Sequence, residues 1–195
     1  MKKAQFIQVI LIVLGISASS MTFAQSHRSG SHGGNGPVTP VQLGDVIVNL
    51  GVGVGADYKG DDYNTGFGTK IAVEKALWQA GPGVITLGGE VGGSFSNGGY
   101  NGYDDYHSST IVAAVRAAWH YGWQVPGLDT YAGVSAGLGF HHYKYSNPDY
   151  SHSSVIPAPG AFVGASYFVT PNFGFNAEAG YDITSVQIGL VFKLM

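Results

Sequence analysis

The end of the chain alternates between two kinds of residue. Within Phe173–Tyr181, and again within Val186–Leu194, every second residue is apolar or aromatic, and most residues between them are small or polar. A period of two is typical of a β-strand whose two faces meet different surroundings. The pattern therefore predicts two strands there, connected at Asp182–Ser185.

The two faces of these strands differ in a way that favours a membrane barrel. The apolar face carries aromatic residues near its ends, and the opposite face is mostly glycine with single charges such as Glu178 and Lys193. A transmembrane barrel strand has this composition, because its outer face meets lipid and its inner face meets a polar lumen.

The same alternation recurs in six earlier stretches, over 45–56, 69–78, 84–95, 109–121, 130–143 and 155–168. Together they predict an all-β chain that forms an eight-stranded antiparallel transmembrane β-barrel. Two places break the pattern. Lys75 interrupts the apolar face of the second stretch, and Pro157 and Pro159 open the sixth. Because proline cannot donate a ladder hydrogen bond, we interpret the residues around the two prolines as a loop rim or strand end.

Connections between the predicted strands alternate between long and short. We expect long polar loops over 59–68, 96–109 and 143–154, and shorter, Pro-containing connections after the second, fourth and sixth stretches. Bacterial barrels place long loops outside the cell and short turns in the periplasm. With the N-terminus in the periplasm, the long loops fall outside the cell and the short connections in the periplasm. The sequence also predicts aromatic girdles at the two membrane rims. The periplasmic girdle comprises Trp78, Trp119, Tyr121 and Tyr167, and the outer one Phe95 or Tyr143.

The first residues predict export. Lys2 and Lys3 precede a short apolar run, Phe6–Ile16, and Thr22–Ala24 fits a cleavage site for small residues. A membrane-anchoring helix is the alternative, but it needs about 20 apolar residues. We therefore predict three segments: a signal peptide over 1–24, a flexible periplasmic segment rich in Gly, Ser and His over 25–44, and an outer-membrane barrel over 45–195.

Composition narrows the class further. Charged residues make up 11%, and 31 of the 195 residues are glycine, whereas soluble domains carry about 25% charged residues. There is no cysteine, which excludes disulfides and thiolate metal sites. A net charge of −3 gives no reason to expect a nucleic-acid partner. The chain therefore fits the outer membrane of a Gram-negative cell, and no cofactor is predicted.

The last part of the chain resembles the closing strands of small outer-membrane β-barrel proteins of the OmpA/OmpX-like class. The resemblance rests on Gly164, Tyr167, Phe168, Thr170, Pro171, Asn172, Glu178, Gly180, Tyr181, Gly189, Leu190, Phe192 and Lys193. It implies an eight-stranded barrel and says little about activity. Such chains usually finish on an aromatic residue that the assembly machinery reads, whereas this one ends Lys193-Leu194-Met195.

Charged residues on the predicted inner face form the first candidate site. They are Lys70, Glu74, Glu90, Arg116, Glu178 and Lys193. An eight-stranded barrel has an interior just wide enough for side chains, so acidic and basic groups there should pair. We expect a structural salt-bridge network in the lumen, with Arg116 and Glu178 as the first pair to test; a proton or ion path is the alternative.

Two His-x-Ser triplets form the second candidate site. They are His107-Ser108-Ser109 and His152-Ser153-Ser154. Residues i and i+2 share a strand face, so the histidine and the serine could act as base and nucleophile. Outer-membrane lipid A deacylases use a similar pair together with a Glu. No carboxylate of this sequence is placed to orient either histidine, so we predict no catalytic residue.

The outer loops form the third candidate site. They bring acidic and tyrosine residues together: Asp61, Asp62, Tyr63, Tyr100, Tyr103, Asp104, Asp105, Tyr106, Tyr145, Asp149 and Tyr150. Tyrosine offers rigid contact area, and Asp pairs could bridge Ca²⁺ between lipopolysaccharide phosphates. A solvated rim without a ligand is the alternative. His27 with His32, and His141 with His142, are not placed to share a metal.

Taken together, these observations predict a non-enzymatic protein, in line with a porin-like or OmpA-like envelope barrel. We expect a monomer with a structural or surface-interaction role, whose outer loops contact outer-membrane lipid, lipopolysaccharide, a host surface or another envelope protein. A lipid A-modifying hydrolase and a small-solute channel are the alternatives.

Overall fold

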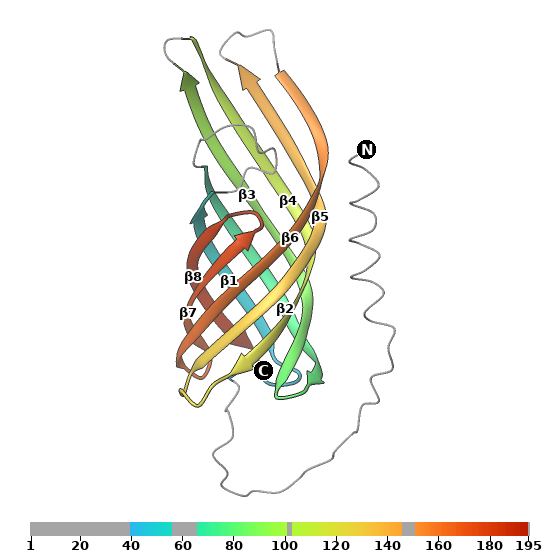
Figure 1. Ribbon diagram of the computed structural model, residues 1–195, viewed down its shortest axis with the longest axis vertical. Helices are drawn as coiled ribbons and strands as arrows, with labels where there is room; N and C mark the ends of the chain where they lie inside the picture. Colours follow the sequence, from blue (N-terminus) through green and yellow to red (C-terminus); the bar gives the residue numbers. More distant parts are fainter. Residues whose placement is uncertain (1–39, 56–65, 101–102, 146–150, 195) are drawn as a thin grey trace, which may run out of the picture. The chain divides into compact units, whose positions relative to one another are not determined.

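A computed structural model describes residues 40–55, 66–100, 103–145 and 151–194. In these ranges the chain forms eight strands: β1 (Val46–Val54), β2 (Phe67–Ala80), β3 (Gly83–Tyr100), β4 (Tyr103–Gly122), β5 (Leu128–Tyr145), β6 (Ser151–Thr170), β7 (Phe173–Tyr181) and β8 (Val186–Leu194). Each strand pairs antiparallel with the next, and β8 pairs with β1, which closes the sheet into a barrel (Figure 1). The predicted eight-stranded antiparallel barrel is confirmed. The described residues include no helix of the length and apolarity that a membrane crossing requires.

Exposure alternates along the strands as the sequence predicts. On β2, Lys70, Ala72 and Glu74 are buried, and the residues between them are exposed. Large apolar side chains on the outer wall are about half exposed, among them Val115 at 59% and Ile188 at 65%. A soluble protein rarely exposes a contiguous apolar surface of this kind, whereas a lipid-facing wall requires one.

Four strands are much longer than the others. β3 to β6 have 18 to 20 residues, and β1, β7 and β8 have 9. In Figure 1 the long strands rise as two paired hairpins beyond the ends of the short ones. The predicted loops over 96–109 and 143–154 are therefore wrong for most of their length, since pairing continues to Tyr100 with Tyr103 and to Lys144 with Ser151. Beyond the apolar band these strands lack apolar alternation, which removes the sequence signal of a strand.

Pro157 and Pro159 lie inside β6. Pro157 pairs with Leu138 and Pro159 with Ala136 on β5, so the prediction of a loop rim here is wrong. On its other side β6 meets β7 only from Ala161 onward. Residues before Ala161 are therefore an edge, where a missing backbone donor leaves no ladder bond unmade.

A β-bulge follows Lys75 in β2, and the alternation itself continues through Lys75. The register between β2 and β3 shifts between Ala76 and Trp78, so Leu77 is an extra residue. Leu77 and Trp78 are consequently both exposed, at 37% and 49%. Lys75 itself lies on the outer face near the strand end. Bulges of this kind are common at barrel rims, where they re-aim side chains.

Residues 40–44 close the barrel end at which the chain enters. Val41 is fully buried against Ile47, Ala76, Phe168 and Val191, among others. The amide of Gly44 donates to the carbonyl of Ala76 at 2.9 Å. Val41, which the sequence assigns to the flexible segment, thus packs into the barrel mouth, whereas Gln42–Gly44 are exposed. The rest of that segment and the predicted signal peptide lie outside the described residues.

Aromatic residues gather at the same end. Trp119 and Tyr121 stack with ring centroids 5.6 Å apart, and Trp123 meets Tyr121 edge-on at 4.9 Å. Trp78 and Tyr167 are half exposed near the ends of their strands, and Phe95 is half exposed toward the opposite end. The side chain of Tyr143 lies outside the described part of the chain.

Candidate functional site

Charged side chains from four strands meet inside the barrel. Alternation turns Lys70 and Glu74 of β2, Glu90 of β3, Arg116 of β4 and Glu178 of β7 into the lumen. Asp182, directly after β7, joins them. We call these six residues the lumenal ion cluster. Each of their side chains is at most 3% exposed.

Lys70 lies among three carboxylates of the cluster. Its Nζ is 2.5 Å from Glu178 Oε1, 2.5 Å from Asp182 Oδ2 and 3.5 Å from Glu90 Oε2. Glu178 and Asp182 belong to a different part of the wall from β2, so these ion pairs cross the barrel interior.

Arg116 lies among three carboxylates as well. Its Nε is 2.7 Å from Glu74 Oε1, its Nη1 is 2.9 Å from Glu90 Oε2 and its Nη2 is 3.0 Å from Glu178 Oε2. The guanidinium also lies over the ring of Phe162, 3.9 Å from its centroid, which adds a cation–π contact. Glu90 and Glu178 thus connect the two cations into one network.

Hydroxyl groups donate further hydrogen bonds to three of the four carboxylates. Thr86 donates to Glu74 at 2.6 Å, Tyr131 donates to Glu178 at 3.1 Å, and Ser135 donates to Asp182 at 3.4 Å. The cluster has two cationic and four carboxylate side chains, so its neutral donors offset part of the acidic excess. An arrangement of this density fills the cross-section of an eight-stranded barrel with side chains.

The structure brings together five of the six lumenal residues expected from the sequence. Lys193 is the exception: it lies 3.6 Å from Asp45 and donates to the carbonyl oxygen of Pro40 at 2.7 Å, in the barrel mouth. Asp182 was missed because we ended the strand at Tyr181. Extending the alternation by one residue would have turned Asp182 inward, next to Lys70.

A second buried pair lies nearer the short-turn end of the lumen. His120 Nδ1 is 2.8 Å from Asp129 Oδ2, and both side chains are at most 2% exposed. The His120 ring also stacks on Tyr131, with centroids 5.0 Å apart. His120 was predicted to face inward, but Asp129 was assigned to a connection, so the pair did not emerge from the sequence.

The His-x-Ser triplets are arranged differently from the expectation. Neither triplet forms a base–nucleophile hydrogen bond within itself among the described side chains. Instead His142 Nδ1 lies 3.0 Å from Ser153 Oγ on the neighbouring strand, and Ser109 pairs with His142 in register. Within the part of the chain that the structure describes, no carboxylate contacts His142, so this pair lacks the third group that orients a catalytic histidine.

The predicted loop surface is only partly within the described residues. Tyr100, Tyr103–Tyr106 and Tyr145 belong to the extended hairpins of β3 to β6, but their side chains are outside the described part. Asp61, Asp62, Tyr63, Asp149 and Tyr150 lie outside the described residues altogether. Among the residues that are described, no three His, Cys, Asp or Glu side chains converge as metal ligands.

Several solved structures are similar to this chain. They include the attachment invasion locus protein Ail of Yersinia pestis (14% identity, TM-score 0.42, 78% of this chain and 100% of that chain) and the N-terminal β-barrel domain of Pseudomonas aeruginosa OprF (18%, 0.44, 78% and 98%). Neisserial surface protein A is a third (17%, 0.41, 77% and 95%). No protein-family model and no curated protein matches the chain.

At such identities the likeness concerns the fold, and we carry no activity or ligand from these proteins to this chain. The chain's own eight antiparallel strands confirm the small eight-stranded barrel that the closing strands indicate, as a matter of fold alone.

Proposed function

We propose that the protein is a non-enzymatic outer-membrane barrel, exported through its signal peptide, with a structural or surface-interaction role. The lumenal ion cluster is the observation that carries this proposal. Its ion pairs join β2, β3 and β4 to Glu178 and Asp182 across the lumen. A lumen crossed by buried, mutually bonded side chains offers no wide aqueous path, which argues for a structural barrel over a solute channel.

The exposed apolar wall supports the membrane location. Outward residues such as Ile71, Val115 and Ile188 are about half exposed, and removing such a surface from water is favourable by about 25 cal/mol per Å². Aromatic residues at the short-turn end supply the interfacial girdle of a membrane barrel. We place this end in the periplasm, so that the long hairpins of β3 to β6 stand outside the cell.

The extended hairpins supply the surface for interaction. In our proposal the monomeric barrel contacts outer-membrane lipid and lipopolysaccharide around its wall, and the tips of β3–β4 and β5–β6 present tyrosine and aspartate residues to a host or envelope partner. Because the strands are paired as far as Tyr100 with Tyr103 and Lys144 with Ser151, the chain that leads to these tips is held in position without a ligand.

Membrane fractionation with heat-modifiable gel mobility and planar-bilayer conductance test this proposal. We expect the protein in the outer-membrane fraction, a mobility difference between boiled and unboiled samples, and no conductance steps. Equal mobility would contradict a closed barrel, and regular steps from the purified protein would favour the channel.

A hairpin trim tests the surface role. Replacing residues 99–105 by Asn-Gly retains the pairing of Gly98 with Tyr106 and closes it with a two-residue turn. We expect unchanged heat-modifiable mobility and reduced binding to cells or envelope fractions. If the trimmed protein folds and binds as the original does, the β3–β4 tip is not the interaction surface.

A further inference from the structure

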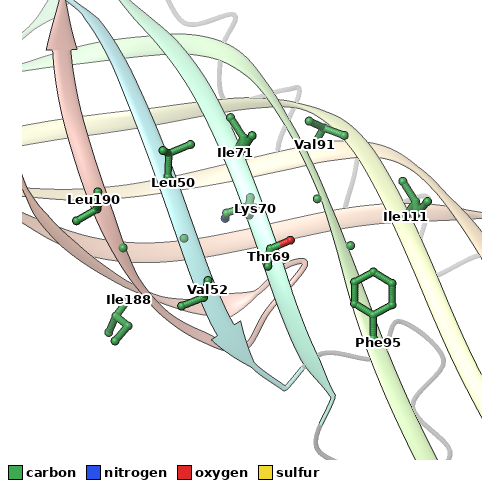
Figure 2. A pocket seen from close by; sticks show the side chains of 14 residues that line it. Leu50, Val52, Thr69, Lys70, Ile71, Val91, Phe95, Ile111, Ile188 and Leu190 are labelled. Carbon is green, nitrogen blue, oxygen red and sulfur yellow. The ribbon is translucent and has the colours of Figure 1, made fainter.

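Two hollows on the outer wall meet near the outer end of the apolar band. The larger is a furrow of about 780 Å³ across β8, β1, β2, β3 and β4. Its outward side chains point away from the sheet, whereas the nitrogen of Lys70 lies behind it (Figure 2). The furrow exists because Thr69 and Gly93 are small while their outward neighbours, including Ile71, Val91 and Ile111, are large.

The smaller hollow, of about 300 Å³, is polar on one side. Ser109, His142 and Ser153 lie in register across β4, β5 and β6, and His142 shares a hydrogen bond with Ser153. The next row along the same strands, toward the periplasmic end, is formed by Ile111, Phe140 and Val155, which are all more than half exposed. The apolar surface therefore ends between these two rows.

The separation of this polar row from the periplasmic girdle matches the thickness of a membrane. Ser109 lies ten residues along β4 from Trp119. At about 3.4 Å per residue and a tilt of about 40°, this length spans roughly 25 Å of membrane, the height of the apolar band of such barrels. Ser109, His142 and Ser153 thus lie at the level of lipid head groups in the outer leaflet.

The sequence of the next row along these strands includes basic residues. Two residues further along their strands, His107 pairs with Lys144, and Lys144 pairs with Ser151. Neither this row nor the row of Ser109, His142 and Ser153 contains an acidic residue. Phosphate oxygens are acceptors for hydroxyl and imidazole donors, and basic residues in the sequence at this level favour them over neutral head groups.

We propose that these two hollows bind one molecule of a phosphorylated glycolipid of the outer leaflet, lipid A. Its phosphate contacts Ser109, His142 and Ser153, and one acyl chain lies in the furrow beside Thr69. The hollows share Ile111 as a common wall, so a polar head joined to a hydrocarbon chain spans them without a gap. This inference rests on the proposed outer-membrane location and adds a defined site to it.

Lipid A binding to the full chain in phosphatidylcholine nanodiscs tests the site. Bisphosphorylated and dephosphorylated lipid A are titrated separately, and native mass spectrometry counts the lipid A molecules that the protein retains. We expect the double variant His142→Ala/Ser153→Ala to bind bisphosphorylated lipid A about tenfold or more weakly. It removes two of the three phosphate contacts, and the loss of a single charge-assisted hydrogen bond already corresponds to about tenfold. His152→Ala, a histidine one residue away on the alternate face of β6, is the matched control and should bind as the original does.

A second variant tests whether the furrow binds the acyl chain. Thr69→Leu fills the hollow with a side chain that suits a lipid-facing wall, and we expect it to weaken both forms of lipid A severalfold. Val134→Leu, an outward substitution on β5 away from the furrow, should change neither. Every variant is first checked for heat-modifiable mobility, so that a misfolded protein is not scored as a lost site.

Three results would overturn the proposed site in a folded protein. They are equal binding of the two forms of lipid A, unchanged binding by both the head-group and the furrow variants, and Ser153-dependent release of a fatty acid, which would assign the row to hydrolysis. If the original chain shows no heat-modifiable mobility and does not enter nanodiscs, the proposed membrane location fails instead.

Discussion

Removal of the guanidinium of Arg116 is the sharpest test of the lumenal ion cluster. In Arg116→Met, three carboxylates lose an ion pair of 3.0 Å or less, and all three stay buried. One lost charged hydrogen bond costs about 1.5–3 kcal/mol. Because the three bonds share one group, their losses do not add. Breaking a buried ion pair from one side costs about 3–5 kcal/mol, and we expect Arg116→Met to lose this much free energy of unfolding.

Urea unfolding of the barrel in detergent micelles, followed by tryptophan fluorescence and by gel mobility of unboiled samples, measures this loss. Lys75→Met is the matched control, because Lys75 is a cation on the outer face of β2, where substitutions change stability by about 0.5 kcal/mol or less. The triple variant Arg116→Met/Glu90→Gln/Glu178→Gln removes charge from two partners and should recover part of the loss. A change below about 1 kcal/mol for Arg116→Met would show that the cluster does not stabilise the barrel as we reason.

Three further predictions concern the rest of the barrel. Lys193→Met removes the cation beside Asp45 in the barrel mouth and should cost about 1–2 kcal/mol in the same unfolding assay. Val41→Asp places an unpaired charge at a fully buried position, and hydrogen exchange of the neighbouring amides should quicken about tenfold or more. Gly88→Ala would overlap the backbone of β2, whereas Gly89→Ala meets only a carbonyl oxygen at 3.4 Å; the first should cost about 1–3 kcal/mol and the second much less.

The alternation along the chain predicts most of the wall correctly, because lipid and lumen impose opposite demands on neighbouring residues. It gives the inward direction of Lys70, Arg116 and Glu178, and hence most of the lumenal ion cluster. It fails where that contrast disappears. Above the membrane both faces of a strand meet water. The sequence beyond Phe95 therefore predicts a loop, although β3 and β4 stay paired as far as Tyr100 with Tyr103.

Other misses have local causes. Asp182 follows the last alternating residue of β7, so the sequence predicts it in the connecting turn and not in the lumen. Pro157 was judged by the general behaviour of proline in sheets, since the sequence does not reveal that β7 is too short to reach it. The burial of Val41 depends on the end of the barrel that the other strands form, which the local sequence around Val41 does not predict.

The unpaired edge of β6 bears on whether copies of the protein can join strand to strand. Residues 151–160 have β5 on one side and, within the described chain, no strand of β7 on the other. An open edge at the surface would accept a strand from a neighbouring molecule and start chain-to-chain polymerisation. Residues i and i+2 of a strand turn the same way, so Pro157 and Pro159 together take two donors from that edge. The two prolines therefore make this edge a poorer template for a strand of a neighbouring molecule.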